Sequence, residues 1–165
     1  MYTRGDQVVY PLHGAGIIED IVEEPLQDCE LSKQTYYVLR IPIGDLKIMV
    51  CKDNASNINM RKVMPSCDIQ EIMSQVCSYD AGAVCVKENW SQRYKDNMEK
   101  IKSGNLIDVA SVFYSLYKKE SQKSLSSAEK KMMSNVKKII LSEIILSYGV
   151  DKVRAEEILE NELAI

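Results

Sequence analysis

The period of the hydrophobic pattern changes near Pro65, and this change constrains the fold more than any other feature of the chain. Before Pro65, short β-branched and aromatic runs alternate with turns that contain Gly or Pro, which is typical of strands. After it, apolar residues recur every three or four positions, which is typical of amphipathic helices. Strands followed by helices predict an α+β multidomain fold. We predict a β module over residues 1–62 and an all-α domain over residues 66–165.

The first part of the chain predicts a small antiparallel sheet. The strand signals are Gln7–Tyr10, Ile17–Val22, Thr35–Ile41 and Lys47–Val50. Pro11 ends the first of these, and a polar stretch containing Pro25 separates the second from the third. Gly44 and Asp45 form a two-residue hairpin signal before the fourth. Such a pattern indicates a small β-barrel or curled sheet, which is short for independent stability and is expected to dock onto another element.

The second part predicts five helices, because each apolar stripe is bounded by capping residues. The expected N-terminal caps are Ser66, Asn89, Ser126 and Asp151, and the expected closing glycines are Gly104 and Gly149. Ser126 and Glu129 have the spacing of a capping box. The stretch Tyr79–Val86, with its Gly82, is interpreted as a loop. We find no internal repeat.

The charge is distributed unevenly. The whole chain carries a net charge of −3, but residues 87–138 hold 12 Lys and Arg against 6 Asp and Glu, a net charge of +6. The overall balance argues against a general polyanion binder, whereas the central block permits a local contact with nucleic acid. A solvated helical surface would also explain it.

Sites for catalysis are scarce in this sequence. His13 is the only His, and it lies in a turn with Pro and Gly, so we interpret it as a surface residue. There is no phosphate-binding loop, dinucleotide fingerprint or zinc-ligand spacing, and the five Cys include no Cys-x-x-Cys pair. We therefore expect a protein that is not an enzyme and has no cofactor, metal or small-molecule substrate. Reduced thiols, no signal peptide and no membrane-spanning run predict a cytoplasmic location.

The only Trp, Trp90, begins a segment in which Arg93 and Lys95 flank Tyr94. An aromatic residue among cations can wedge against unstacked bases while the cations hold phosphates. Trp90, Tyr94 and Met98 also follow helical spacing, so Trp90 could instead be the first core residue of a helix. The pattern alone leaves both interpretations open.

A second basic feature lies on the long helix. Lys130 and Lys137 are seven residues apart, as are Lys131 and Lys138, so these residues share one sector away from the apolar face. This lysine stripe (Lys130, Lys131, Lys137 and Lys138) could contact phosphates, or it could be a solubility surface.

Several motifs together resemble the CarD/CdnL family of bacterial transcription regulators. They are Gly5-Asp6-Gln7-Val8-Val9-Tyr10-Pro11-Leu12-His13-Gly14, Tyr37-Val38-Leu39, Gly44-Asp45-Leu46, Asn89-Trp90-Ser91-Gln92-Arg93-Tyr94-Lys95 and Leu125-Ser126-Ser127-Ala128-Glu129-Lys130-Lys131-Met132. They cover the whole chain in order. A β module similar to the N-terminal one also occurs in the transcription-repair coupling factor. The motifs in the helical part are therefore the ones that point to CarD/CdnL itself.

The resemblance implies a Tudor-like N-terminal domain that binds the β subunit of RNA polymerase through its sheet. It also implies a helical domain that contacts promoter DNA at the upstream edge of the −10 element, where a Trp wedges into the minor groove and stabilises the open complex. Trp90 falls on that Trp. Arg93 and Lys95 fall on basic positions beside it, and Lys130 and Lys131 fall on a basic pair that approaches the DNA backbone.

This chain departs from the family pattern in two places. Gln92 stands where the family often has Arg, and Glu24 and Met49 stand where some members have Arg on the polymerase-facing strands. A contact through the sheet edge would survive the second departure, because backbone groups supply the pairing. The candidate polymerase-binding residues are Ile48, Met49, Val50 and Glu24.

These observations favour a polymerase-binding transcription regulator that contacts promoter DNA and no membrane. An alternative is a protein–protein adaptor without nucleic-acid contact, in which Trp90 is either core or a protein-binding hot spot. Solvent exposure of Trp90 separates the core interpretation from the others.

Overall fold

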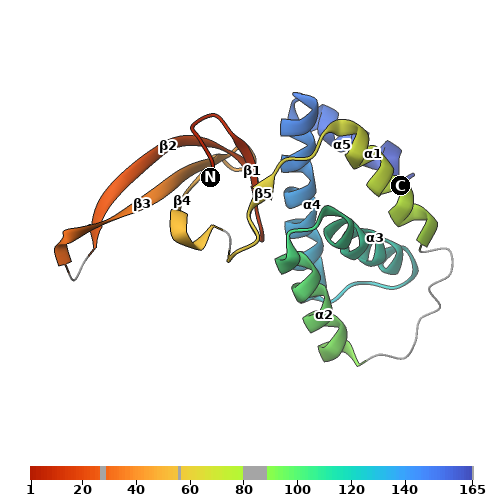
Figure 1. Ribbon diagram of the computed structural model, residues 1–165. Coiled ribbons are helices and arrows are strands. Elements are labelled where there is room, and N and C mark those ends of the chain that lie inside the picture. The colour runs from red at the N-terminus through yellow and green to blue at the C-terminus, as the bar shows by residue number, and fades with distance from the viewer. Residues whose placement is uncertain (27–28, 56, 80–88, 165) are drawn as a thin grey trace.

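The computed structural model describes residues 1–26, 29–55, 57–79 and 89–164. Its N-terminal part is an antiparallel five-stranded sheet with the strand order β4-β3-β2-β1-β5, and a short 3₁₀ helix, η1 (Lys52–Asn54), follows β4 (Figure 1). The strands are β1 (Gln7–Tyr10), β2 (Gly14–Leu26), β3 (Cys29–Ile41), β4 (Leu46–Cys51) and β5 (Arg61–Lys62). The predicted sheet is therefore confirmed, with β4 at one edge and β5 at the other.

The hairpin of β2 and β3 is longer than the sequence predicted. Pro25, which was expected to break the strand, lies within β2 opposite Lys33. It is tolerated because β1 pairs only with Gly14–Ile17, so β2 has a single neighbour at Pro25 and no second ladder is interrupted. A register shift between Ile18 and Asp20 bends the hairpin, which extends away from the helices (Figure 1).

One face of the sheet forms a small core of its own. Its buried members are Val8, Ile18, Tyr37, Leu39, Val50, Ala55 and Met60. Alternation places Tyr37 and Leu39 on this face, two residues apart in β3. Tyr2 closes the end of this core, because its ring meets Tyr37 edge-on and its hydroxyl donates to the Met60 carbonyl at 2.7 Å.

Five helices follow in the described part of the chain. They are α1 (Ser66–Tyr79), α2 (Trp90–Ser103), α3 (Leu106–Gln122), α4 (Ser127–Tyr148) and α5 (Lys152–Leu163). The predicted caps at Asn89, Ser126 and Asp151 are confirmed, since each side chain accepts a backbone N–H bond from the first turn of its helix. Gly104 and Gly149 are left-handed C-caps as predicted.

Two local predictions about α1 were wrong. Ser66 is inside the helix rather than its cap, because the Pro65 carbonyl already accepts from the N–H groups of Asp68 and Ile69. Tyr79 is the last residue of α1 rather than the first of a loop. The remainder of that predicted loop, residues 80–86, lies outside the described residues.

The long helix α4 is the centre of the molecule. It lies between the sheet and the other helices (Figure 1). Val136, Ile140 and Ile144 are buried in the helical core, as their spacing predicted, and Met133 is half-buried. On the sheet side, Ser142 is fully buried, and its hydroxyl accepts the Ala15 N–H bond at 2.7 Å. The sheet and the helices are therefore packed directly against each other.

Candidate nucleic-acid interface

Trp90 is on the surface of the protein and does not belong to the helical core. It is the first residue of α2 and is 47% exposed. Its ring stacks on that of Tyr94, one turn later, with 5.5 Å between the ring centroids. Further along the same stripe Met98 is half-buried and Ile101 is buried. The apolar stripe of α2 thus begins in solvent and enters the core only toward its C-terminal end, which excludes the core interpretation of Trp90.

The first turn of α2 is held against the start of α4 by the carboxylate of Glu129. The side chain of Glu129 is 6% exposed and closes the capping box, accepting from the Ser126 N–H at 3.0 Å. Lys119 of α3 donates to Glu129 Oε1 at 2.5 Å, and Arg93 of α2 reaches the same oxygen at 3.4 Å. One buried carboxylate therefore joins three helices close to Trp90.

The charge of Glu129 is stabilised by these partners. Burial raises the pKa of the carboxyl, but the hydrogen bonds from Lys119 and Ser126 outweigh burial and lower the pKa to about 2. Glu129 is therefore ionised at neutral pH, and it compensates part of the positive charge of Arg93. Arg93 was expected to contact DNA; in this structure it also attaches α2 to α4.

The other basic candidates are directed into solvent. Lys95, Lys130, Lys131 and Lys138 are exposed and Lys137 is half-buried. In the described part of the chain none of the five forms an ion pair with an acidic side chain. Because Arg93 contacts Glu129, the start of the lysine stripe is beside the first turn of α2. Figure 1 shows that this end of α2 points away from the sheet. Trp90, Lys130 and Lys131 thus share one end of the helical domain, whereas Lys137 and Lys138 directly precede Ile139, which approaches Gly14 of the sheet.

Gln92 departs from the basic character of this turn. Its side-chain amide donates to Asp96 Oδ1 at 2.8 Å, so it is engaged along its own helix. Gln92 and Asp96 together place a neutral and an acidic group beside Trp90, where the family often has an Arg. The surface around Trp90 is therefore less basic than the resemblance implies.

The candidate polymerase-binding residues lie on two strands, β4 and β2, that are not neighbours in the sheet. Ile48, Met49 and Val50 lie in β4, which among the described strands pairs with β3 alone. Met49 is 46% exposed and Ile48 is half-buried, but Val50 is 4% exposed and belongs to the sheet core. The side chain of Val50 is therefore not accessible to a partner. Glu24 is exposed in β2 opposite Gln34, so β3 lies between it and the edge strand.

Other types of site are not evident in the described residues. No group of three or more His, Cys, Asp or Glu side chains there could hold a metal ion. None of the described helices is long and apolar enough to cross a membrane. His13 is exposed and stacks on Tyr10, with 4.9 Å between the rings.

Comparison with known proteins agrees with the arrangement of a sheet followed by helices. The family described as "CarD-like/TRCF RID domain" matches residues 2–64, and the family described as "CarD, C-terminal domain" matches residues 80–160. A Bacillus subtilis (strain 168) protein named "Putative transcription factor YdeB" is 35% identical over 150 residues, which cover 91% of this chain and 94% of that protein.

The chain belongs to the CarD/CdnL family of transcription regulators. The sheet is the Tudor-like module of this family, as the resemblance implied, and the protein is a transcription regulator.

Two structural roles were missed by reasoning from sequence. Glu129 was recognised as part of a capping box, but its contact with α2 was not. Glu143 is 1% exposed and pairs with Arg61 of β5, although it follows the apolar run Ile139-Ile140-Leu141. A single acidic residue between apolar runs of a helix is the signal that could have identified it, because a buried charge requires a partner.

Proposed function

We propose that this regulator binds the β subunit of RNA polymerase through its sheet and stabilises the open promoter complex by wedging Trp90 into the minor groove. Opening a promoter unstacks base pairs at the upstream edge of the bubble. An aromatic side chain that fills this gap disfavours reannealing, and a few kcal/mol change the lifetime of the open complex by powers of ten.

The exposure of Trp90 carries this proposal. A Trp that is 47% exposed at a helix start, with its ring supported by Tyr94, is a large apolar surface that the fold itself does not use. Aromatic residues in such positions serve as contact points for partners. Lys130 and Lys131, at the same end of the domain, supply cations for phosphates near the wedge.

Docking on polymerase would compensate for weak DNA affinity. The protein has a net charge of −3, which disfavours DNA binding by the free protein. Attachment to polymerase raises the local concentration of the helical domain at the promoter. The edge strand β4 supports such attachment, because an unpaired strand edge can accept a strand from another protein.

The substitution Trp90→Ala tests the proposal. We expect the open complex on polymerase to decay about tenfold faster, while binding to the β subunit is unchanged. Unfolding free energy should fall by less than about 2 kcal/mol, since truncating a fully buried aromatic costs about 3–5 kcal/mol. Tyr117→Ala is the matched control, because Tyr117 is an exposed aromatic of α3. An unchanged lifetime for Trp90→Ala would exclude the wedge and favour the adaptor.

A further inference from the structure

Arg61 connects three elements with one side chain. Its Nη1 and Nη2 donate to the two oxygens of Glu143 in α4 at 2.6 and 2.9 Å. Its Nε donates to the carbonyl of Gly104, the residue that ends α2, at 2.8 Å. A single guanidinium in the last strand of the sheet thereby fixes α4 and the C-terminal end of α2 at the same point.

The carboxylate of Glu143 is buried and fully engaged. Besides Arg61, it accepts the N–H bond of Met64 at 3.2 Å, and the side chain is 1% exposed. A buried carboxylate is strongly destabilising without its cation. The bidentate contact between Arg61 and Glu143 also has a fixed plane and direction. The single ammonium group of a Lys cannot reproduce this geometry. This pair therefore determines orientation as well as attraction.

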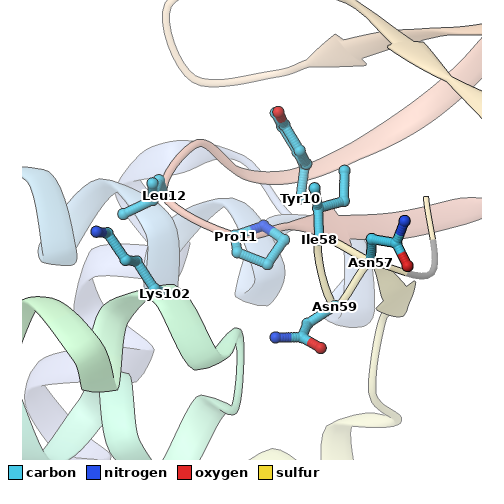
Figure 2. Close-up of a pocket in the computed structure, with 7 residues that line it drawn as sticks. All are labelled: Tyr10, Pro11, Leu12, Asn57, Ile58, Asn59 and Lys102. Atoms are coloured by element: carbon cyan, nitrogen blue, oxygen red, sulfur yellow. The ribbon is translucent and has the colours of Figure 1, made fainter. Parts of the chain in front are cut away.

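Packing around the end of α2 is close at one point and open beside it. A Cβ on Gly104 would lie 2.8 Å from the Pro11 side chain, so the helix end touches the turn after β1. An open pocket lined by Tyr10, Pro11, Ile58 and Lys102, among others, adjoins this contact (Figure 2). The contact between the sheet and the helices, called the joint below, therefore has two parts. One is the packing of α4 on Gly14 and Ala15, and the other is the set of hydrogen bonds from Arg61 beside this open pocket.

The geometry of α2 amplifies any movement at the joint. A helix rises about 1.5 Å per residue, so the 14 residues of α2 place Trp90 about 21 Å from Gly104. Because Glu129 holds the first turn of α2 against α4, the helices would turn together, and a rotation of about 10° relative to the sheet about Gly104 would move Trp90 by about 4 Å. That displacement is similar to the spacing of about 3.4 Å between successive base pairs.

We propose that Arg61 and Glu143 are positioning residues that hold the polymerase-facing sheet and Trp90 in one fixed spatial relation. The inference rests on the proposed function, in which the sheet docks on polymerase and Trp90 enters the DNA. The pair itself touches neither partner. The pair acts by keeping Trp90 at a set distance and angle from β4, the strand proposed to dock on polymerase.

The experiment separates orientation from binding. Arg61→Lys keeps the charge but loses the two-pronged contact, and Glu143→Gln keeps the shape but loses the charge. Arg154→Lys is the matched control, because Arg154 pairs with Glu157 on the exposed surface of α5. For each full-length variant we would measure residual dipolar couplings of the free protein, affinity for the β subunit and open-complex lifetime on polymerase.

In Arg61→Lys and Glu143→Gln we expect the residual dipolar couplings of the sheet and of the helices to fit two separate alignment tensors. Two tensors would show that the two parts no longer keep one fixed orientation. Affinity for the β subunit should be unchanged, while the open-complex lifetime falls about tenfold, within the range of substitutions that act on coupling between sites. The control should match the parent in all three measurements. If a single substitution prevents folding, the double variant Arg61→Met with Glu143→Met replaces it, since apolar pairs often substitute for buried ion pairs without loss of stability.

Two results would overturn the inference. One is a folded variant whose couplings still fit a single tensor and whose open-complex lifetime equals that of the parent. The other is a shortened lifetime with a single tensor, because the loss would then not arise from orientation. Failure of the proposed function is separate, since it appears as an unchanged lifetime in Trp90→Ala, whereas joint rigidity is measured without polymerase or DNA.

Discussion

Ser142 lies directly against Gly14 at the contact between α4 and the sheet. A Cβ on Gly14 would be 2.4 Å from the Ser142 hydroxyl and 3.4 Å from the Ile139 Cα. The hydroxyl accepts from the Ala15 N–H at 2.7 Å and donates to the Ile139 carbonyl at 2.6 Å. The first residues of β2 therefore approach the backbone of α4 as closely as a glycine allows.

Gly14→Ala is expected to lower the free energy of unfolding by about 3 kcal/mol, because it combines backbone strain with a steric clash. The strain arises because Gly14 has a φ of +108°, and the clash is with Ser142. Gly44→Ala is the matched control, since Gly44 has a φ of +82° but no atom within 4 Å of the added Cβ. The control should lose about 1 kcal/mol. Urea unfolding of both variants measures the difference, and equal losses would contradict the close contact.

Glu129 is expected to make stability depend on pH in the acidic range. Its folded pKa of about 2 is below the ordinary value of 4.5, so its contribution is complete above pH 4.5 and is lost as pH falls toward 2. The shift corresponds to about 3 kcal/mol.

Glu129→Gln isolates this contribution, because a glutamine does not titrate. The variant should be less stable than the parent at pH 7, and the difference should shrink between pH 4.5 and 2 as measured by chemical unfolding. The pKa of Asp6 is also lowered, by the backbone hydrogen bond from Thr3, but this effect is common to both proteins and cancels. A difference in stability that does not vary with pH would show that the Glu129 charge is not stabilised in the fold.

The sequence predicted the elements of this fold well because their signals are local. Asn89, Ser126 and Gly104 act within one turn of their own helices, so each can be recognised without knowledge of the tertiary structure. A hairpin also forms at Gly44, but Ile41 pairs with Leu46, so its loop has the four residues 42–45 and not the two that were predicted. The prediction that Pro25 breaks the strand was wrong, because a strand tolerates Pro where it has only one neighbour. Whether β2 has one neighbour at Pro25 depends on how far β1 extends along it, which is a property of strand pairing and not of the residue.

The joint and the surroundings of Trp90 could not be derived in this way. Arg61 and Glu143 are 82 residues apart in sequence, and nothing local to either identifies the other as its partner. The exposure of Trp90 was equally undetermined, because its helical spacing with Tyr94 and Met98 fits a core stripe as well as a surface one. Where a stripe enters the core depends on which helices cover it.

Met49→Glu is expected to weaken binding to the β subunit of polymerase about tenfold, which corresponds to about 1.4 kcal/mol. The substitution places a charge at an exposed apolar position of the edge strand, where a partner strand is proposed to pair. Val153→Glu is the matched control, since Val153 is 68% exposed on α5. Binding can be measured by titration with the isolated β subunit. Unchanged affinity in Met49→Glu, with folding intact, would place the docking surface elsewhere on the sheet.

Replacing Lys130 and Lys131 with Gln is expected to weaken the contact of polymerase-bound protein with a forked promoter template, to the same extent for different sequences. Phosphate contacts carry no base information, and each lost contact should flatten the slope of log K against log salt by about 0.9. The double variant should therefore reduce the slope by about 1.8 if both lysines touch phosphates.

The double variant Lys152→Gln with Arg154→Gln is the control for this experiment. It removes the same charge from α5, where both residues pair with glutamates on their own helix. Its salt slope should equal that of the parent, which separates a local contact from an effect of net charge. Without polymerase, neither the parent nor the variants should bind the template appreciably, given the net charge of −3. Equal slopes and equal open-complex lifetimes for the parent and the Lys130/Lys131 variant would identify the lysine stripe as a solvated surface and favour the adaptor.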